Sequence, residues 1–421
     1  MQELSDRLFA EISKIRLIDP HTHINPLSAA STSLNDLLGY HYYTELAHSA
    51  GLPKHAIESA KGVELSKLLI KQLETCTNTV QYSWLVEIVQ SFFGYQGDQI
   101  EVGHVESLFG TAEVKMRAPT WTDSVFERTG LEALFLTNDF DDPLEGFDTK
   151  RYIPCLRTDD LVFKLDQPSV QNRIGKATGL EWHGIEAVVQ KLFEKFVTKG
   201  ARACAISLPP DFEPIRPSAS EFKAALDAIG LGTVTTEQKR IASNGVFYLL
   251  ADGCETHRLP FDLMIGVRRS VYEQGVYQGQ DLFDQRTSLY LYRQLFNDKP
   301  SVTFPVSVLT HGQNQELTSY AWIFPNVVTS GHWWYSNIPI YIEADTRARL
   351  EAVPFTKQIG YYSDAYKLEF ILPKFNMYRR CLARVLAQDF VIARGWSEER
   401  AVGLAYEILR GNVERIFVPN H

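Results

Sequence analysis

The stretch RLIDPHTH, residues 16–23, joins a short apolar run to two histidines, His21 and His23. Side chains alternate between the two faces of a β-strand, so both imidazoles would point to the same side. Two imidazoles on one face can bind a transition-metal ion. The pair alone is weak evidence, because many such pairs are surface or hydrogen-bonded core histidines. Its place at the end of an apolar run, just before Asn25-Pro26, favours metal binding.

Seven further runs of the same kind recur along the chain. They are rich in Val, Ile, Leu, Tyr and Phe and are bounded by polar or turn residues. Runs of this kind are typical of strands that are buried on both faces. They are ALFLTND (133–139), RYIPCLR (151–157), ARACAISLPP (201–210), FDLMIGVRR (261–269), VTFPVSVLTH (302–311), NVVTSGHWW (326–334) and IGYYSD (359–364).

Helical patterns lie between several of these runs, at residues 184–200, 280–300 and 314–324. Strands that alternate with helices indicate parallel βα units, and eight such units predict a closed barrel of roughly 250 residues. We therefore expect an α/β protein with a distorted (β/α)8 TIM barrel. An open, doubly wound sheet is the alternative fold.

The chain of 421 residues is longer than such a barrel requires. Residues 28–130 show helical patterns and no convincing buried strand, which predicts an inserted helical subdomain after the first strand. Residues 1–27 and 131–421 would form the barrel, and a second helical block, about 366–416, would close the chain. The first 17 residues read as an amphipathic helix.

Closure of the barrel would bring the eighth strand beside the first. The last run ends in Asp364, whose carboxylate could then join His21 and His23 on one ion. This geometry predicts one divalent metal ion held by two histidines and one carboxylate, with open positions for water or substrate. The ligand set suits Zn²⁺, and Mn²⁺ or Fe²⁺ as alternatives. Asp19 is expected to fix the strand end or a histidine tautomer.

The charge and composition of the chain limit the kinds of molecule that it is expected to bind. The net charge is −9 and the sequence pI is about 5.7, which argues against a nucleic-acid or anionic-membrane surface. No apolar stretch approaches the roughly 20 residues that cross a bilayer. The five cysteines show no pairing pattern, so we expect free thiols and a cytoplasmic location. A small anionic substrate remains compatible with the charge.

The order and spacing of these motifs resemble one family. The first-strand HxH, the helical insertion and the last-strand Ser-Asp are similar to the amidohydrolase superfamily, and within it to the uronate (glucuronate) isomerases. Further matching segments are YHYYTEL (40–46), LTNDFDDP (136–143), CLRTDD (155–160), AISLPP (205–210), MIGVRRSV (264–271), GHWWYSNIP (331–339) and YSDAY (362–366).

The resemblance implies an activity and its cofactor. It implies interconversion of an aldose and a ketose uronic acid, glucuronate or galacturonate, by a proton shift between C1 and C2 through an enediol. It implies one divalent ion, often zinc, on His21, His23 and Asp364, with Asp364 also placed to move a proton. A metal ion would polarise the carbonyl and stabilise the developing negative charge.

The resemblance also implies roles for residues around the metal. His41 and Tyr42 would reach the substrate from the insertion, and Arg157 would bind its carboxylate. Trp333 and Trp334 would wall the sugar site, although neighbours on a strand face opposite ways, so only one of them should face it. A small sugar acid is the expected partner, and we also expect a homo-oligomer.

Several positions depart from the family pattern. Tyr366 stands where the family usually has an arginine that pairs with the substrate carboxylate, and Arg268 or Arg269 could replace that contact. His311 is an extra imidazole expected near the mouth of the site. These departures leave two alternatives open. One is a hydrolase or decarboxylase acting on another small carboxylate with the same metal site, and the other is a barrel that only binds a sugar acid or metal.

Overall fold

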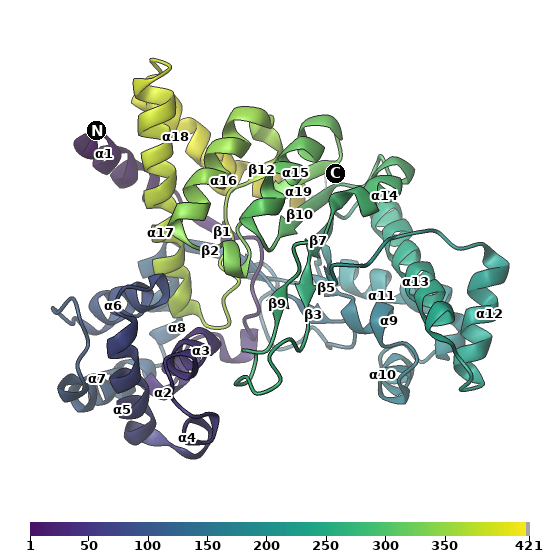
Figure 1. Cartoon of the computed structure of the whole chain (residues 1–421), viewed down its shortest axis with the longest axis horizontal. Helices are drawn as coiled ribbons and strands as arrows, with labels where there is room; N and C mark the ends of the chain where they lie inside the picture. The colour runs from purple at the N-terminus through teal and green to yellow at the C-terminus, as the bar shows by residue number, and fades with distance from the viewer. Residues whose placement is uncertain (418–421) are drawn as a thin grey trace.

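The computed structural model describes residues 1–417 and shows parallel strands surrounded by helices (Figure 1). The parallel strands are β1 (Leu17–Asp19), β2 (Leu131–Phe135), β3 (Asn138–Asp139), β4 (Tyr152–Ile153), β5 (Leu156–Arg157), β6 (Cys204–Leu208), β7 (Phe261–Ile265), β10 (Phe304–Val308), β11 (Val327–Ser330) and β12 (Gln358–Ile359). All eight runs predicted from the sequence contain strand.

The strands pair in chain order. One ladder runs β1-β2-β4 and the other runs β12-β11-β10-β7-β6-β5-β3. Because β2 continues into β3 and β4 into β5 after two residues each, the two ladders form one sheet of eight strand positions. Every pair in these two ladders is parallel, for example Cys204 opposite Phe261 between β6 and β7. The predicted α/β barrel fold is therefore confirmed.

The first and last strand positions meet beyond their ends. The backbone N–H of Asp364 donates to the carbonyl of His21 (3.1 Å), and the N–H of His23 donates to the carbonyl of Ala365 (2.8 Å). In the described part of the chain no strand ladder joins β12 to β1. The barrel is therefore distorted at this seam, and two backbone hydrogen bonds hold the segments that follow the two strands together.

Helices follow most of the strands and cover the sheet. The buried apolar side chains of α11, α13 and β6, β7 and β10 belong to one hydrophobic cluster, as expected for helices packed on a barrel. These helices are α9 (Asp159–Phe163), α10 (Pro168–Thr178), α11 (Ile185–Thr198), α12 (Ala219–Gly230), α13 (Thr236–His257), α14 (Arg293–Asp298), α15 (His311–Ile323) and α16 (Pro339–Ala352).

Only helices and turns occupy the segment between β1 and β2, as expected. The helices are α2 (Leu34–Leu38), α3 (His41–Ser49), α4 (Lys54–Ser59), α5 (Gly62–Leu73), α6 (Val80–Phe93), α7 (Val105–Met116) and α8 (Trp121–Thr129). They lie at the lower left of Figure 1. Their buried side chains share one core cluster with α17 (Ile371–Val385), so the division at residues 27 and 131 stays a prediction.

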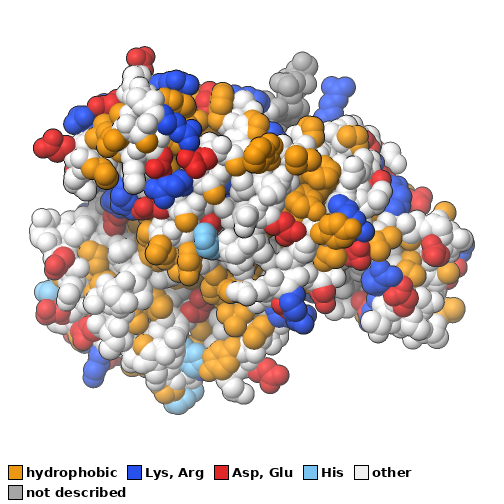
Figure 2. Space-filling view, turned by 45° about the horizontal axis from the view of Figure 1, so that its top comes forward, with side chains coloured by type: hydrophobic (Ala, Val, Ile, Leu, Met, Phe, Trp, Pro, Cys, Tyr) orange, Lys and Arg blue, Asp and Glu red, His pale blue; other side chains and the backbone are white. Residues whose placement is uncertain are grey.

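The chain ends are helical and pack together. α1 (Gln2–Ile12) contacts α17 and α18 (Glu398–Tyr406), and α19 (Asn412–Phe417) follows. The predicted amphipathic first helix and the closing helical block are confirmed. Between residues 1 and 417 no helix combines the length and apolar character needed to span a membrane. On the face in Figure 2, acidic and basic side chains are interspersed, without a broad basic surface.

One segment differs from the sequence prediction. Residues 280–300 read as a helix, but the structure places β9 (Leu282–Phe283) at the start of this range and α14 only at its end. β9 pairs antiparallel with β8 (Val267–Arg268), which follows β7 after Gly266. Gly266 has φ +113°, a conformation that favours glycine. The β8–β9 hairpin extends from the carboxyl end of β7 to the inserted helices, where Tyr272 contacts His48 of α3.

Candidate metal centre and substrate cavity

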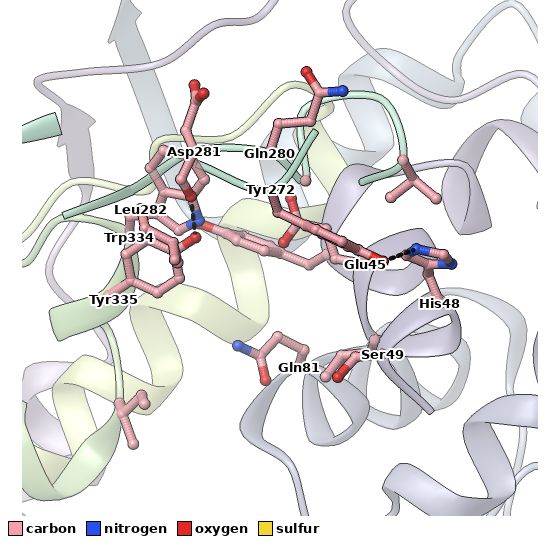
Figure 3. A pocket seen from close by; sticks show the side chains of 15 residues that line it. Glu45, His48, Ser49, Gln81, Tyr272, Gln280, Asp281, Leu282, Trp334 and Tyr335 are labelled. Carbon is pink, nitrogen blue, oxygen red and sulfur yellow. Dashed lines mark hydrogen bonds between the residues drawn. The ribbon is translucent and has the colours of Figure 1, made fainter. Parts of the chain in front are cut away.

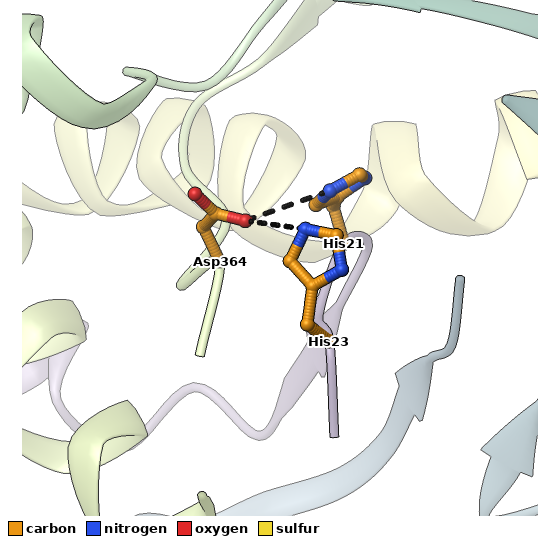
Figure 4. A group of neighbouring side chains, drawn as sticks. All are labelled: His21, His23 and Asp364. Carbon is orange, nitrogen blue, oxygen red and sulfur yellow. Dashed lines mark ion pairs between the residues drawn. The ribbon is translucent and has the colours of Figure 1, made fainter. Parts of the chain in front are cut away.

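Two histidines and a carboxylate converge where the first and last strand positions meet. His21 and His23 follow β1, and Asp364 follows β12. Oδ1 of Asp364 lies 3.2 Å from Nε2 of His23 and 3.6 Å from Nε2 of His21 (Figure 4). One ligand atom from each residue falls within 4.8 Å of the others. The structure thus brings together the three residues that the sequence predicts as metal ligands.

In both histidines, Nδ1 contacts a group on the side of the ring away from Asp364. These contacts determine that Nε2 is the unprotonated nitrogen that faces the Asp364 carboxylate. Oγ1 of Thr137 donates to the carbonyl of Thr22 (3.0 Å), so it accepts from Nδ1 of His23 at 2.8 Å. Oδ2 of Asp262 lies 3.4 Å from Nδ1 of His21. Protons on both Nδ1 atoms leave the Nε2 lone pairs turned toward Asp364.

This arrangement fits a metal ion. Nε2 of His21 and Oδ1 of Asp364 are both buried and have no hydrogen-bond partner among residues 1–417. Lone pairs that converge on one point without a proton between them repel, and a cation at that point satisfies all three. Burial lowers the pKa of His23, which favours the neutral imidazole that a metal requires. The donor set, two nitrogens and one carboxylate oxygen, suits Zn²⁺, Mn²⁺ or Fe²⁺.

Burial and the neighbouring carboxylates have opposite effects on the pKa of His21. Burial lowers its pKa, but the hydrogen bond and charge of Asp262 together with the charges of Asp364 and Asp19 outweigh burial and raise the pKa. A proton therefore competes with a metal ion for Nε2. The sequence analysis did not select Asp262. Its position inside the apolar run 261–269 could have identified it, because a buried carboxylate requires a partner.

A buried lysine supports the backbone of Asp364. Asp364 has φ +52°, which is uncommon for a residue other than glycine. Nζ of Lys374, on α17, donates to the carbonyl of Ser363 (2.7 Å) and to the hydroxyl of Tyr40 (3.1 Å). The Tyr40 hydroxyl in turn donates to the carbonyl of Asp364 (3.3 Å). Burial lowers the pKa of Lys374 to about 8.

Asp19 holds the same turn from the first strand. Its Oδ1 accepts from the N–H of Ser363 at 3.0 Å and lies 3.5 Å from the N–H of His21. Burial raises the pKa of Asp19 to about 6. Asp19 therefore fixes the strand ends, one of its two expected roles, and does not contact an imidazole nitrogen as a hydrogen-bond partner.

A cavity of about 100 Å³ opens onto His23 and Asp364, two of the three predicted metal ligands. Its wall contains most of the residues that the sequence analysis selected, together with Arg269. The lining residues are His23, His41, Arg157, Ser207, Met264, Arg269, Gln278, Asp281, Trp333, Trp334, Asp364 and Tyr366. The hairpin residues Gln278 and Asp281 were not foreseen, because the loop that carries them has no periodic pattern.

Two guanidinium groups line this cavity. Nε of Arg157 lies 3.1 Å from Oδ2 of Asp159, and Nη1 of Arg269 lies 2.6 Å from Oδ2 of Asp281. Arg268 instead pairs with Asp284 at 3.5 Å. Of the two arginines considered as a replacement for the family arginine, Arg269 is thus the one that reaches the cavity.

Aromatic rings form much of the remaining wall. The Tyr366 ring stacks on His23 at 4.9 Å between centroids and meets the His41 ring edge-on at 5.3 Å. Both Trp333 and Trp334 line the cavity, so the expectation that only one would face it is wrong. Trp334 has φ +43°, and this left-handed turn removes the strand alternation on which the expectation rested.

His41 is the first residue of α3 and is nearly fully buried. Burial, with a further effect from the charge of Lys374, lowers its pKa to about 3. Nδ1 of His41 has no hydrogen-bond partner in the part of the chain that the structure describes. The imidazole is therefore neutral and free to hydrogen-bond with a ligand.

Three selected residues do not line this cavity: His21, Tyr42 and His311. Tyr42 instead lines a second, adjoining cavity of about 550 Å³. The Lys374 ammonium lies 4.9 Å from the centroid of the Tyr42 ring. His311 begins α15, where its Nδ1 lies 2.5 Å from Oδ1 of Asp345 and its ring stacks on Tyr341. The expectation that His311 lies at the mouth of the site is wrong, because the contact with Asp345 holds it against α16.

The fold and the site together define a class: a parallel α/β barrel that carries a candidate single-metal centre at the carboxyl ends of its strands. No protein-family model matches the chain. The chain is nevertheless similar to the uronate isomerase of Brucella canis, with 21% identity over 447 aligned positions, which cover 97% of this chain and 94% of that protein.

Two solved structures show the same fold. The uronate isomerase of Thermotoga maritima has a TM-score of 0.90 at 18% identity, covering 99% of this chain and 97% of that chain. The glucuronate isomerase of Caulobacter crescentus has a TM-score of 0.89 at 18% identity, covering 99% and 94%. The resemblance to uronate isomerases that the motifs predict is thus confirmed along nearly the whole chain.

Proposed function

We propose that the protein is a metal-dependent isomerase that interconverts the aldose and ketose forms of a uronic acid, such as glucuronate or galacturonate. The observation that carries this proposal is the convergence of His21, His23 and Asp364 beside a cavity that two arginines also line. The similarity to uronate isomerases over the whole chain supports it. Zn²⁺ is the proposed ion, with Mn²⁺ or Fe²⁺ as alternatives.

The metal ligands would serve the proton shift. A divalent ion held by His21, His23 and Asp364 supplies Lewis-acid polarisation of the substrate carbonyl. Asp364 also lines the cavity, and we assign to its second carboxylate oxygen the transfer of the proton between C2 and C1. A pKa of about 3 makes His41 a weak base, so its role is to hydrogen-bond a substrate hydroxyl as a neutral imidazole.

The other wall residues would bind and orient the sugar acid. Arg157 and Arg269 provide planar donors for the carboxylate, and Tyr366 adds a hydroxyl beside them. Trp333 and Trp334 offer apolar faces to the carbon chain and exclude water from it. Tyr42, which the sequence placed among the catalytic residues, lies behind His41, so we assign it to packing α3 against Lys374.

A hydrolase or decarboxylase with the same metal site is the second candidate. It has less support, because the three similar proteins described above are all isomerases. A cytoplasmic location and a homo-oligomeric state stay predictions. The absence of nucleic-acid partners also stays a prediction.

Incorporation of deuterium from the solvent into the product tests the proposed reaction. In D₂O, protein loaded with Zn²⁺ is expected to convert glucuronate or galacturonate to the ketose with deuterium entering at the carbon that receives the proton, which ¹H NMR follows directly. Treatment with a chelator should abolish conversion, and added Zn²⁺ or Mn²⁺ should restore it. Metal-loaded protein that converts neither sugar acid, but releases CO₂ or cleaves an ester or amide, would contradict the proposal in favour of the second candidate.

Tyr366→Arg tests the proposed carboxylate end of the cavity. Tyr366 lies beside Arg157 in the cavity wall, so an arginine there adds a cation near the substrate carboxylate. The variant is expected to raise kcat/KM on uronates about tenfold, chiefly through a lower KM, as one charge-assisted hydrogen bond allows. Steady-state kinetics on both sugar acids provides the measurement. Unchanged or lower activity would count against the assignment of this end of the cavity.

A further inference from the structure

A larger cavity adjoins the one that opens onto His23 and Asp364. It has a volume of about 550 Å³ and lies between α3 of the insertion, the β8–β9 hairpin and the turn after β11 (Figure 3). Trp334 and Asp281 line both cavities, so the two are neighbours. The hydroxyl of Tyr272, on the hairpin, contacts Nε2 of His48, on α3, at 3.2 Å and links the two sides of this second cavity.

The sizes of the two cavities suggest that they act together. Small-molecule sites usually enclose about 300–1,000 Å³. The metal-facing cavity is smaller than this, and the second cavity falls within the range. A third hollow, of about 670 Å³, also borders Arg157 and Tyr366, but its wall contains Asp139, Asp141, Asp142 and Glu145, whose carboxylates would repel a substrate that carries a carboxylate. We therefore place the remainder of a bound molecule in the second cavity, because the charge of the wall and not the volume separates it from the third hollow.

The side chains around the second cavity favour a neutral, hydroxylated ligand. Four aromatic residues contribute to its wall: Tyr42, Tyr272, Trp334 and Tyr335. Aromatic faces of this kind suit the C–H faces of a sugar ring. Glutamine, histidine and serine side chains supply further donors and acceptors. No lysine or arginine belongs to the described lining, so a second carboxylate would have no cationic partner there.

Two buried polar atoms of residues in this wall have no hydrogen-bond partner among the described residues. They are Oε1 of Glu45 and Nε1 of Trp334, one an acceptor and the other a donor. Burial, and to a smaller extent the charge of Asp281, raises the pKa of Glu45 to about 8, so its carboxyl group is mostly protonated at neutral pH. A protonated carboxyl can donate one hydrogen bond and accept others, as paired contacts with sugar hydroxyls require. A ligand with hydroxyl groups would satisfy both atoms.

We propose that the second cavity is a subsite for a neutral sugar unit linked to the uronic acid, so that the preferred substrate is a disaccharide with the uronic acid at its reducing end. The inference rests on the proposed isomerase function. Because C1 and C2 react and C6 is the carboxylate, the link must use the oxygen of C3, C4 or C5. Isomerisation moves one hydrogen from C2 to C1 and one hydroxyl proton, and it leaves the glycosidic bond intact.

The test compares three substrates with the metal-loaded enzyme. They are a free uronate, a disaccharide that carries a neutral hexose on O4 of the same uronate, and digalacturonate, whose second unit is charged. The neutral disaccharide is expected to have a kcat/KM about tenfold above that of the free uronate, the gain of roughly one aromatic contact and one hydrogen bond. Digalacturonate should gain nothing.

Tyr272→Ala locates the subsite, and Tyr277→Ala is its matched control on the same hairpin. Tyr272 is 48% exposed and Tyr277 is 82% exposed, so neither change removes a core side chain. Tyr272→Ala should erase the disaccharide preference through KM while activity on the free uronate persists, and Tyr277→Ala should change neither.

Each other outcome has its own meaning. Turnover of the free uronate without a disaccharide preference overturns the subsite and leaves the proposed function standing. A preference that survives Tyr272→Ala, or a preference for digalacturonate, overturns the placement or the neutral character of the second unit. No turnover of any of the three removes the proposed function and the subsite together.

Discussion

Asp364→Asn is expected to lower kcat/KM on a uronate by a factor of about 10²–10⁴, the usual effect of losing a group that transfers a proton. The substitution keeps the shape of the side chain but removes its negative charge and one lone-pair oxygen. Two histidine nitrogens would then face a neutral amide, so metal affinity should fall as well. Kinetics at saturating Zn²⁺ and metal content after dialysis measure the two effects separately.

The chain offers a matched control for this variant. Asp345 contacts a ring nitrogen of His311 at 2.5 Å, so it forms the same type of Asp–His contact outside the metal-facing cavity. Asp345→Asn should keep metal and most of the activity, with circular dichroism as a check on folding. If Asp364→Asn retains more than a tenth of wild-type activity while its metal content is unchanged, Asp364 is neither the ligand nor the proton carrier.

Lys374→Met is expected to damage stability and activity at once. Lys374 is fully buried and donates to the carbonyl of Ser363 and to the hydroxyl of Tyr40, which hold the left-handed turn at Asp364. Methionine fills similar space but leaves the buried carbonyl of Ser363 without this charged donor. The free energy of unfolding should fall by about 2–3 kcal/mol, because the relief of lysine desolvation offsets part of the lost hydrogen bonds.

Activity should fall about 10- to 100-fold in the same variant, the usual effect of losing a group that orients a metal ligand. Urea denaturation gives the stability, and kcat/KM with metal titration gives the activity. Lys299→Met is the control, because Lys299 is also mostly buried and pairs with Asp252 at 2.6 Å, and neither residue lines any of the three cavities described above. It should lose stability and keep activity. A Lys374→Met enzyme with unchanged kcat and metal affinity would show that the lysine does not position Asp364.

The sequence predicted the features that depend on periodicity and on topology. Apolar runs marked all eight strand positions, because parallel strands buried on both faces have few polar residues. Chain-order pairing then placed His21, His23 and Asp364 together, although more than three hundred residues separate the first from the last. The helical insertion followed from patterns of 3.6-residue period over residues 28–130.

Features that depend on single contacts were not predictable. The β8–β9 hairpin has strands of two residues each, too short for a periodic signal, so the range 280–300 read as a helix. Asp262 and Lys374 act through partners distant in sequence. The left-handed turn at Trp334 overrides strand alternation, and the contact with Asp345 holds His311 outside the cavity. Each outcome depends on tertiary contacts that local sequence does not encode.

The most direct test of the metal centre is anomalous diffraction from crystals of the Zn²⁺-loaded protein, recorded on both sides of the zinc absorption edge. The account predicts one peak per chain, within coordination distance of Nε2 of His21, Nε2 of His23 and a carboxylate oxygen of Asp364. A peak bound by other residues, or none between these three side chains in protein that isomerises uronates, would contradict it.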